Sequence, residues 1–232
     1  MSEQVTISVI IPTHNEQENI RELLPVLTKD PSGLVLEILV VDAHSTDHTA
    51  RVATEFGAKV IASPRLSRAY QLNLGAQNAS GQVLYFLHAD VRPFRKFAEV
   101  ISESIQKGKS PGCFSYQFDS SSQMLQLNSW FTQFNGVFAG GGDQSLFIEK
   151  ELFFLLGGYD EKFCVMEDFD LVRRIRQKTD FHVLPHKLTV SARKYVHAGW
   201  LRVQVANLIA FSLFLLKIKP ASIKSLYLKL LK

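Results

Sequence analysis

The sequence predicts an α/β protein built on a mostly parallel sheet with helices on both faces. Its first 108 residues alternate strand-like and helix-like patterns with short links, a pattern typical of parallel strands joined by right-handed crossovers. The strand candidates are continuous apolar runs, as expected for strands buried on both faces. Three of these runs lead into polar residues, at Thr13, Asp42 and His88. Because ligands bind outside the carboxyl ends of such strands, these residues predict a common cleft.

The strand–helix units follow one another through the first half of the chain. Apolar runs predict the strands, and apolar residues that recur every three or four positions predict the helices between them. Gly57 suits the C-terminus of the second helix, and Ser45 or Thr46 is expected to cap its N-terminus. The predicted strands are 5–12, 35–42, 58–62 and 83–88, and the predicted helices are 16–29, 47–56, 67–79 and 93–108.

The second half is predicted to be less regular. Alternating apolar residues at 112–119 indicate an antiparallel strand, and a glycine run at 140–142 precedes a further apolar segment. Short strands are expected at 181–184 and 188–192. The predicted helices are 121–134, 149–156, 167–178 and 200–217, with a basic amphipathic tail at 222–232.

Length and composition indicate a single domain. The chain has 232 residues, of which 46% are hydrophobic, enough for one large core. Its formal net charge of +4 favours acidic partners such as phosphates, nucleotides or an anionic membrane surface. We expect no nucleic-acid partner, because no dense basic block or known nucleic-acid module is present.

The cysteines and the apolar segments bear on localisation. Cys113 and Cys164 lie far apart in the sequence, each in an apolar setting, which favours a reduced, cytoplasmic protein. They form no CxxC pattern, so we expect no cysteine zinc site, and we expect no signal peptide. The apolar stretch at 203–216 is shorter than the ~20 residues of a spanning helix. The basic tail after it is predicted either to lie in a membrane interface, peripherally on the inner face, or to pack as a core or dimer-forming helix.

Acidic residues at strand and helix ends are the candidate site residues. Asp42 can accept a hydrogen bond from a ribose hydroxyl or a base, or it caps the next helix. Asp90, with His88 as a nitrogen ligand, can bind a divalent cation that bridges a diphosphate, or it is a turn residue. Glu167 and Asp168 begin a helix, where the helix dipole alone favours acids and where one of the two can act as a general base.

Glycines and basic residues add weaker candidates. The run at 140–142 would let the backbone approach a ligand closely, although such runs are more often flexible turns. Arg65, Arg68, Arg193 and Lys194 are candidates to hold a diphosphate, although most basic residues are simply solvated.

Six motifs in order resemble glycosyltransferase family two, whose members have the GT-A fold. Three of them look like its successive nucleotide-binding motifs: SVIIPTHNE at 8–16, ILVVDAHSTD at 38–47 and LHAD at 87–90. The later motifs are GDQ at 142–144, GGY at 157–159 and MED at 166–168. The spacing is similar to that of the radical-SAM/selenodomain-associated transferase subgroup. The resemblance spans nearly the whole chain.

The resemblance implies an inverting, metal-assisted transfer of a sugar from a nucleoside-diphosphate sugar to an acceptor hydroxyl. It implies a nucleotide-binding half at 1–108, an acceptor and catalytic half at 109–198, and an apolar helix with a basic tail at 199–232. Asp168 would be the catalytic base, and Asp90 with His88 would hold Mn²⁺ or Mg²⁺. The other implied nucleotide-sugar-binding residues are Pro12, Thr13, Glu16, Asp42 and Arg68, and those at the acceptor or sugar are Asp143, Gln144 and Glu167. The acceptor is left open, with a lipid-linked acceptor as one option. For the oligomeric state, a homodimer is one option.

Two positions depart from the family pattern. In place of the usual Asp-x-Asp metal motif the chain has His88-Ala89-Asp90, whose nitrogen ligand either shifts the preference toward Mn²⁺-like ions or leaves the metal weakly held. His14 stands where the family has an aromatic residue, so stacking on the base is either lost or made by the imidazole.

Three other functions remain open. A mononuclear metal hydrolase would use His14, His44 and His88, with Asp90, as zinc ligands. A non-catalytic nucleotide-binding or membrane scaffold protein would explain why the metal motif keeps only one carboxylate. A nucleotidyltransferase would share this type of sheet and cleft. All readings with a nucleotide depend on one expectation, that Asp42, Asp90 and Asp168 converge on one cavity.

Overall fold

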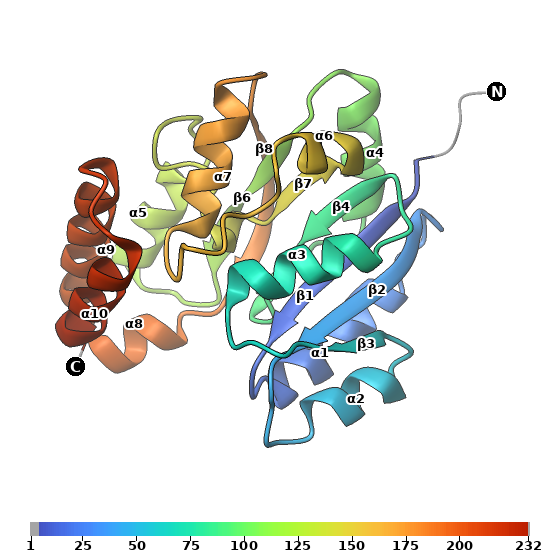
Figure 1. The fold of residues 1–232 in the computed structure, drawn as a ribbon, viewed down its shortest axis with the longest axis horizontal. Coiled ribbons are helices and arrows are strands. Elements are labelled where there is room, and N and C mark those ends of the chain that lie inside the picture. Colours follow the sequence, from blue (N-terminus) through green and yellow to red (C-terminus); the bar gives the residue numbers. More distant parts are fainter. Residues whose placement is uncertain (1–4, 232) are drawn as a thin grey trace.

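The computed structural model describes residues 5–231 and contains a single mixed sheet (Figure 1). Its strands are β1 (Ile7–Thr13), β2 (Val35–Asp42), β3 (Lys59–Ala62), β4 (Val83–Phe86), β5 (Val91–Arg92), β6 (Gly112–Phe118), β7 (Leu146–Glu149) and β8 (His182–Val190). The strand order is β3-β2-β1-β4-β7-β6-β8-β5. The sheet confirms the predicted α/β fold class, although β7 and β5 run antiparallel to their neighbours.

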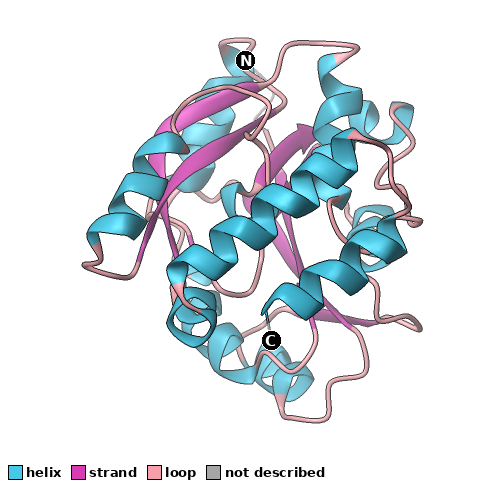
Figure 2. Cartoon of the chain, turned by 90° about the vertical axis from the view of Figure 1, so that its left-hand side faces the viewer, coloured by secondary structure: helices cyan, strands magenta, loops and turns pink. Residues whose placement is uncertain are grey.

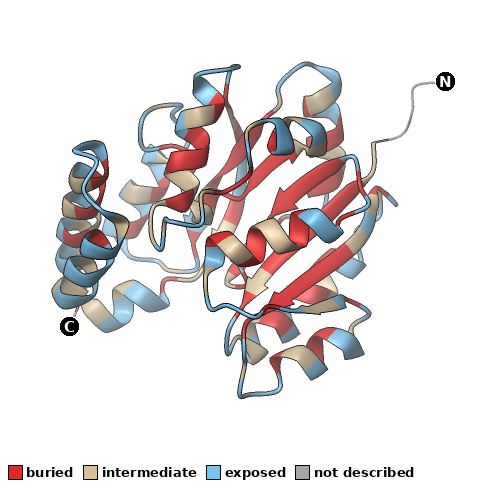
Figure 3. Cartoon of the chain, in the orientation of Figure 1, coloured by how far each residue is buried: buried red, intermediate tan, exposed pale blue. Residues whose placement is uncertain are grey.

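Helices cover both faces of the sheet. They are α1 (Gln17–Thr28), α2 (Thr49–Glu55), α3 (Arg68–Asn78), α4 (Phe97–Gln106), α5 (Gln123–Phe131), α6 (Lys150–Leu155), α7 (Glu167–Arg176), α8 (Arg193–Ala198), α9 (Trp200–Leu215) and α10 (Pro220–Leu231), with a 3-10 turn, η1 (Gly142–Gln144). One apolar core joins the sheet to α1, α2, α4 and α5, and a second joins it to α3, α6 and α7. Figure 3 shows the strands buried between these layers.

The sheet topology creates a crevice beside β1. From β1 the chain builds outward to β2 and β3 on one side, whereas β4 pairs with β1 on the other. The loops that follow β1 and β4 therefore diverge, and ligands bind at such a switch point in open α/β sheets.

Several element predictions need correction. Strand β6 was expected to be antiparallel, but it pairs with β7 at only two positions and runs parallel to β8 along its whole length. The two short strands expected after residue 180 are one strand, β8, whose register shifts opposite Phe114 and Ser115. Asp47, not Ser45 or Thr46, accepts the hydrogen bond from the Thr49 amide at the start of α2. Elements β5 and α8 were not predicted, because two strand residues and six helical residues carry no periodic signal.

Helices α9 and α10, here called the C-terminal hairpin, pack side by side at one end of the molecule (Figures 1 and 2). Their buried residues Phe211, Phe214 and Ile223 pack against Phe163 and Phe169, which flank the start of α7. The hairpin is therefore anchored next to Asp168, the residue that the sequence predicts to be catalytic. Across residues 5–231, the structure has no helix with both the length and the hydrophobicity needed to cross a membrane.

Candidate active site

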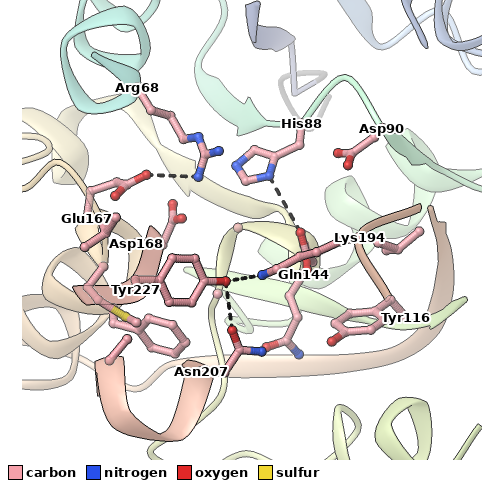
Figure 4. Close-up of a pocket in the computed structure, with 18 of the residues that line it drawn as sticks. Arg68, His88, Asp90, Tyr116, Gln144, Glu167, Asp168, Lys194, Asn207 and Tyr227 are labelled. Carbon is pink, nitrogen blue, oxygen red and sulfur yellow. Dashed lines mark hydrogen bonds and ion pairs between the residues drawn. The ribbon is translucent and has the colours of Figure 1, made fainter. Parts of the chain in front are cut away.

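A cavity of about 1250 Å³ lies between the strand ends and the C-terminal hairpin (Figure 4). The loops after β1 and β4, the start of α3, the turn around η1 and the start of α7 form one side of it. Helices α8, α9 and α10 form the other side. The predicted site residues that line it are Pro12, Thr13, Glu16, Arg68, His88, Asp90, Asp143, Gln144, Glu167 and Asp168.

Asp42 is the predicted site residue that does not line the cavity. It is buried, and one carboxylate oxygen accepts a hydrogen bond from Thr13 Oγ1 at 3.0 Å. The other accepts from the Ser45 amide at 3.1 Å. Asp42 thus lies behind Thr13 and orders the loops after β1 and β2, and its direct contact with a nucleotide stays a prediction.

Gln71 bridges the carboxyl ends of β1 and β2, which carry Thr13 and Asp42. This buried side chain reaches from α3, and its Nε2 donates to the Thr13 carbonyl at 2.9 Å and to the Val41 carbonyl at 2.8 Å. Thr13 is the last residue of β1 and Val41 the last but one of β2, and the Thr13 carbonyl also accepts from the Ala43 amide at 3.0 Å. The amide of Gln71 therefore holds β1 and β2 together at the edge of the cavity.

His88, Asp143 and Asp90 form a second group of side chains that line the cavity. Figure 4 shows His88 and Asp90. His88 Nδ1 lies 3.8 Å from Asp143 Oδ1. Burial and the charge of Arg68 oppose protonation of His88, yet Asp143 and Asp168 raise the pKa of its imidazole above the ordinary value. Burial would raise the pKa of Asp143, but the hydrogen bond and charge of His88 lower it.

The donor set of His88 and Asp90 fits a divalent cation that shares its coordination with a ligand. Within residues 5–231, no hydrogen bond or ion pair engages the Asp90 carboxylate, which lines the cavity. In the same range, no three His, Cys, Asp or Glu side chains gather into a group that can hold a metal ion. One or two carboxylates are nevertheless the usual protein contribution to Mg²⁺ when substrate phosphates supply other ligands, and an imidazole suits transition-metal ions.

The three-histidine zinc site of the hydrolase alternative is not assembled. His14 lines the cavity, but its Nδ1 lies 2.7 Å from the Ala43 carbonyl, a geometry that occupies this ring nitrogen. His44 lies outside the cavity lining. This reading is therefore set aside.

Glu167 and Asp168 have different surroundings at the start of α7. The Glu167 side chain is only 3% exposed and pairs with Arg68, with 3.2 Å between Arg68 Nη1 and Glu167 Oε1. Asp168 is half-buried and faces the cavity. Burial raises the pKa of Asp168 and the charge of Glu167 raises it further, to about 6, although His88 and Arg68 act in the opposite direction. Asp168 is thus the carboxylate placed to accept a proton near neutral pH.

The residue before this pair has an unusual backbone. Met166 has φ 64°, in the left-handed region that non-glycine residues rarely adopt. Its side chain packs against the C-terminal hairpin, which helps to hold this conformation. Such outliers cluster at functional sites, because the surrounding structure must impose them.

Gly142 and Gln144 shape the floor of the cavity. A Cβ on Gly142 would overlap the His88 ring and lie 2.8 Å from Asp168 Oδ2, so only glycine fits between these two side chains. Gln144 was predicted to border the sugar or acceptor. Its amide is instead engaged by the backbone: Oε1 accepts from Gly140, and Nε2 donates to the carbonyls of Phe114 and Thr132. Gln144 thus orders the turn, and a role in ligand contact stays a prediction.

The basic candidates divide into two groups. Arg68, Arg193 and Lys194 line the cavity, as predicted for groups that hold a diphosphate. Arg65 lies outside the lining and pairs with Glu161, with 3.3 Å between Nη1 and Oε2.

The C-terminal hairpin contributes residues that the sequence analysis missed. Tyr227 accepts a hydrogen bond from Lys194 Nζ, and its hydroxyl donates to Asn207 Oδ1 at 3.0 Å (Figure 4). The available signal was the polar residues Gln204 and Asn207, which interrupt a mostly apolar helix. Both line the cavity.

The family model described as Glycosyl transferase family 2 matches residues 8–161. Two curated relatives are 4,4'-diaponeurosporenoate glycosyltransferase of Staphylococcus haemolyticus and dolichol-phosphate mannosyltransferase of Pyrococcus furiosus. The first is 33% identical over 120 residues, which cover 48% of this chain and 32% of the relative. The second is 35% identical over 107 residues, which cover 44% of this chain and 30% of the relative. The matches therefore span about a third of the length of these relatives.

Solved structures share the fold at low sequence identity. The mannosyltransferase PcManGT from Pyrobaculum calidifontis, solved with GDP-Man and Mn²⁺, has a TM-score of 0.67 at 18% identity and covers 90% of this chain and 63% of its own. S. aureus TarS 1-349 in complex with UDP-GlcNAc has a TM-score of 0.68 at 17% identity and covers 97% of this chain and 71% of its own. These likenesses establish the GT-A type of fold.

Proposed function

This chain belongs to glycosyl transferase family 2, and we propose that it moves a glycosyl group from a nucleoside-diphosphate sugar to an acceptor hydroxyl with inversion. The observation that carries this proposal is the placement of Asp168. It faces the same cavity as Asp90 and His88, and its pKa of about 6 suits a base at neutral pH.

The proposed reaction is a single displacement. The acceptor oxygen attacks the anomeric carbon, Asp168 takes the hydroxyl proton, and the bond from that carbon to the diphosphate oxygen breaks. Attack and departure occur on opposite faces of the carbon, so the configuration inverts. Relatives whose printed names describe glycosyl transfer support this reaction class.

The cavity side chains divide the remaining work. Thr13, Pro12 and Glu16 lie at the strand ends where the nucleoside would bind. Arg68 and Lys194 would offset the negative charge of the diphosphate. Asp90 and His88 would hold Mn²⁺ or Mg²⁺, which when bound supplies further positive charge for the leaving diphosphate. The fit of this donor set and the Mn²⁺ printed for PcManGT support the metal proposal.

A thermal-shift panel tests the donor. The purified protein is heated with UDP-, GDP-, ADP- and dTDP-sugars, each with and without Mn²⁺, and we expect one base to stabilise it most. Release of the nucleoside diphosphate is then measured with that donor. Stabilisation without any release, across a range of acceptors, would favour the non-catalytic nucleotide-binding alternative. Release of pyrophosphate from a nucleoside triphosphate would favour a nucleotidyltransferase.

A further inference from the structure

The outward face of α9 is largely apolar, with Ser212 as an exposed polar residue on it. Leu201, Val205, Leu208 and Leu215 recur at helical spacing and are 67%, 43%, 61% and 58% exposed. The opposite face carries the buried residues Val203, Ala206, Ala210, Phe211 and Phe214. A contiguous apolar stripe exposed on a helix normally marks a contact surface. No segment of residues 5–231 covers this outward stripe. We therefore infer that an apolar surface outside these residues covers it.

The stripe continues into the mouth of the cavity. Apart from Leu66, five large apolar residues line the cavity while each remains at least half exposed: Phe131, Phe134, Phe138, Leu208 and Leu228. We call them the apolar rim. Leu208 belongs to both the stripe and the rim, and the Phe138 ring lies 4.6 Å from the Phe211 ring of α9. The stripe and the rim therefore form one surface at the hairpin end of the molecule.

The charge around this surface selects its partner. The 52 residues after Asp180 contain nine Lys or Arg and no acid, although the formal charge of the whole chain is only +4. On the hairpin, Arg202, Lys217, Lys219, Lys224 and Lys229 are all exposed. A second copy docked face to face would oppose these like charges, whereas an anionic bilayer complements both the cations and the apolar stripe.

We propose that the C-terminal hairpin docks on an anionic lipid surface and that the acceptor hydroxyl belongs to a membrane-resident amphiphile whose apolar tail crosses the rim. This inference rests on the proposed glycosyl transfer. The hairpin packs directly on the segment that carries Asp168, through Phe211 and Phe169. Docking of the hairpin would therefore bring the base close to the lipid surface.

Vesicle flotation of the full chain tests the docking. The vesicles contain either phosphatidylcholine alone or equal parts of phosphatidylcholine and phosphatidylglycerol. The test variant combines Leu201→Glu and Val205→Glu, which change exposed residues outside the cavity lining. The matched control is Leu155→Glu, on α6, where the leucine is 82% exposed. We expect the wild type and the control to float with the anionic vesicles, and the bound fraction of the double variant to fall at least about fivefold.

An acceptor assay tests the second half of the proposal. With the donor found in the thermal-shift panel, transfer is compared between dodecanol in the anionic vesicles and glycerol in solution. We expect transfer to dodecanol to exceed transfer to glycerol, and the double variant to lose most of that advantage. Equal or greater transfer to glycerol would overturn the acceptor assignment.

Other outcomes separate the possible failures. Absence of flotation for the wild type, or equal flotation of the double variant, would overturn the lipid docking. Light scattering that shows a wild-type dimer dissociated by the double substitution would identify a second copy as the occupant instead. Thermal stabilisation by the donor is recorded on the same samples. Flotation without stabilisation refutes the glycosyl transfer and the acceptor with it, whereas stabilisation without flotation refutes only the lipid inference.

Discussion

Arg68 and Glu167 form an ion pair across the cavity, with 3.2 Å between Nη1 and Oε1, although they are 99 positions apart in the chain. The pair joins the start of α3 to the start of α7. Glu167 is buried, and its second carboxylate oxygen has no hydrogen-bond partner among residues 5–231. The uncompensated part of this charge acts on the adjacent Asp168, whose pKa it raises.

We expect Glu167→Gln to shift the acidic limb of the activity profile to lower pH. Asp168 must be ionised to take a proton, so wild-type activity should rise as the pH passes through about 6. Loss of the neighbouring negative charge favours ionisation of Asp168, and the limb should move down by roughly half a unit to one unit. The measurement is kcat/KM for nucleoside diphosphate release against pH. Glu161→Gln, at the exposed Arg65 pair, is the control, and an unmoved limb in Glu167→Gln would contradict the argument.

Asp168→Asn should abolish transfer and retain donor binding. The amide cannot accept the hydroxyl proton, so kcat should fall by roughly 10²–10⁴-fold. The thermal shift produced by the nucleotide sugar should persist, because the donor contacts lie elsewhere in the cavity. Asp180→Asn, at an exposed position outside the lining, should behave as the wild type. Near-normal turnover in Asp168→Asn would assign the base to another residue.

Gly142→Ala should reduce both activity and stability. The added methyl group would overlap His88 and come 2.8 Å from Asp168 Oδ2, so both side chains must move. We expect turnover to fall by about tenfold or more, because such displacements misalign the reacting groups. Gly136→Ala is the matched control, since a Cβ there meets nothing within 4 Å. The measurements are kcat and the melting temperature of both variants. Equal values for the two variants would show that the turn around η1 can shift to accommodate the methyl group, which would contradict the prediction.

Gln144→Leu should lower the free energy of unfolding by about 2–4 kcal/mol, because buried backbone groups lose their partners. The Gly140 amide and the carbonyls of Phe114 and Thr132 depend on this one side chain. Urea unfolding measures the loss. Gln133→Leu changes an exposed residue of the same region and should stay close to the wild type. Equal free energies of unfolding for the two variants would contradict this structural role and would favour the predicted contact of Gln144 with the ligand.

Asp90→Asn should remove the part of donor-induced thermal stabilisation that depends on Mn²⁺. An amide is a weaker ligand for a hard cation than a carboxylate. Stabilisation by the nucleotide sugar without the ion should change little. A full Mn²⁺ effect in the variant would mean that the cation binds elsewhere, and Asp180→Asn again serves as the unperturbed comparison.

Local patterns determined most of the fold. Apolar runs and helical periodicity located β1, β2, β4, α1 and α3, because burial of apolar surface is decided largely by the residues themselves. The same logic placed Thr13, His88 and Asp168 at element ends, and all three line one cavity. The family membership that the motifs indicate is confirmed.

Tertiary packing alone decided what each polar side chain contacts. It turned Asp42 toward Thr13, engaged Gln144 with three backbone groups, and brought Tyr227 of the hairpin to Lys194. These partners lie from a few to more than thirty positions away, and a hydrogen bond needs atoms within about 3 Å. A residue type can specify that a group must be buried or exposed. Only the relative placement of distant elements determines which donor meets which acceptor.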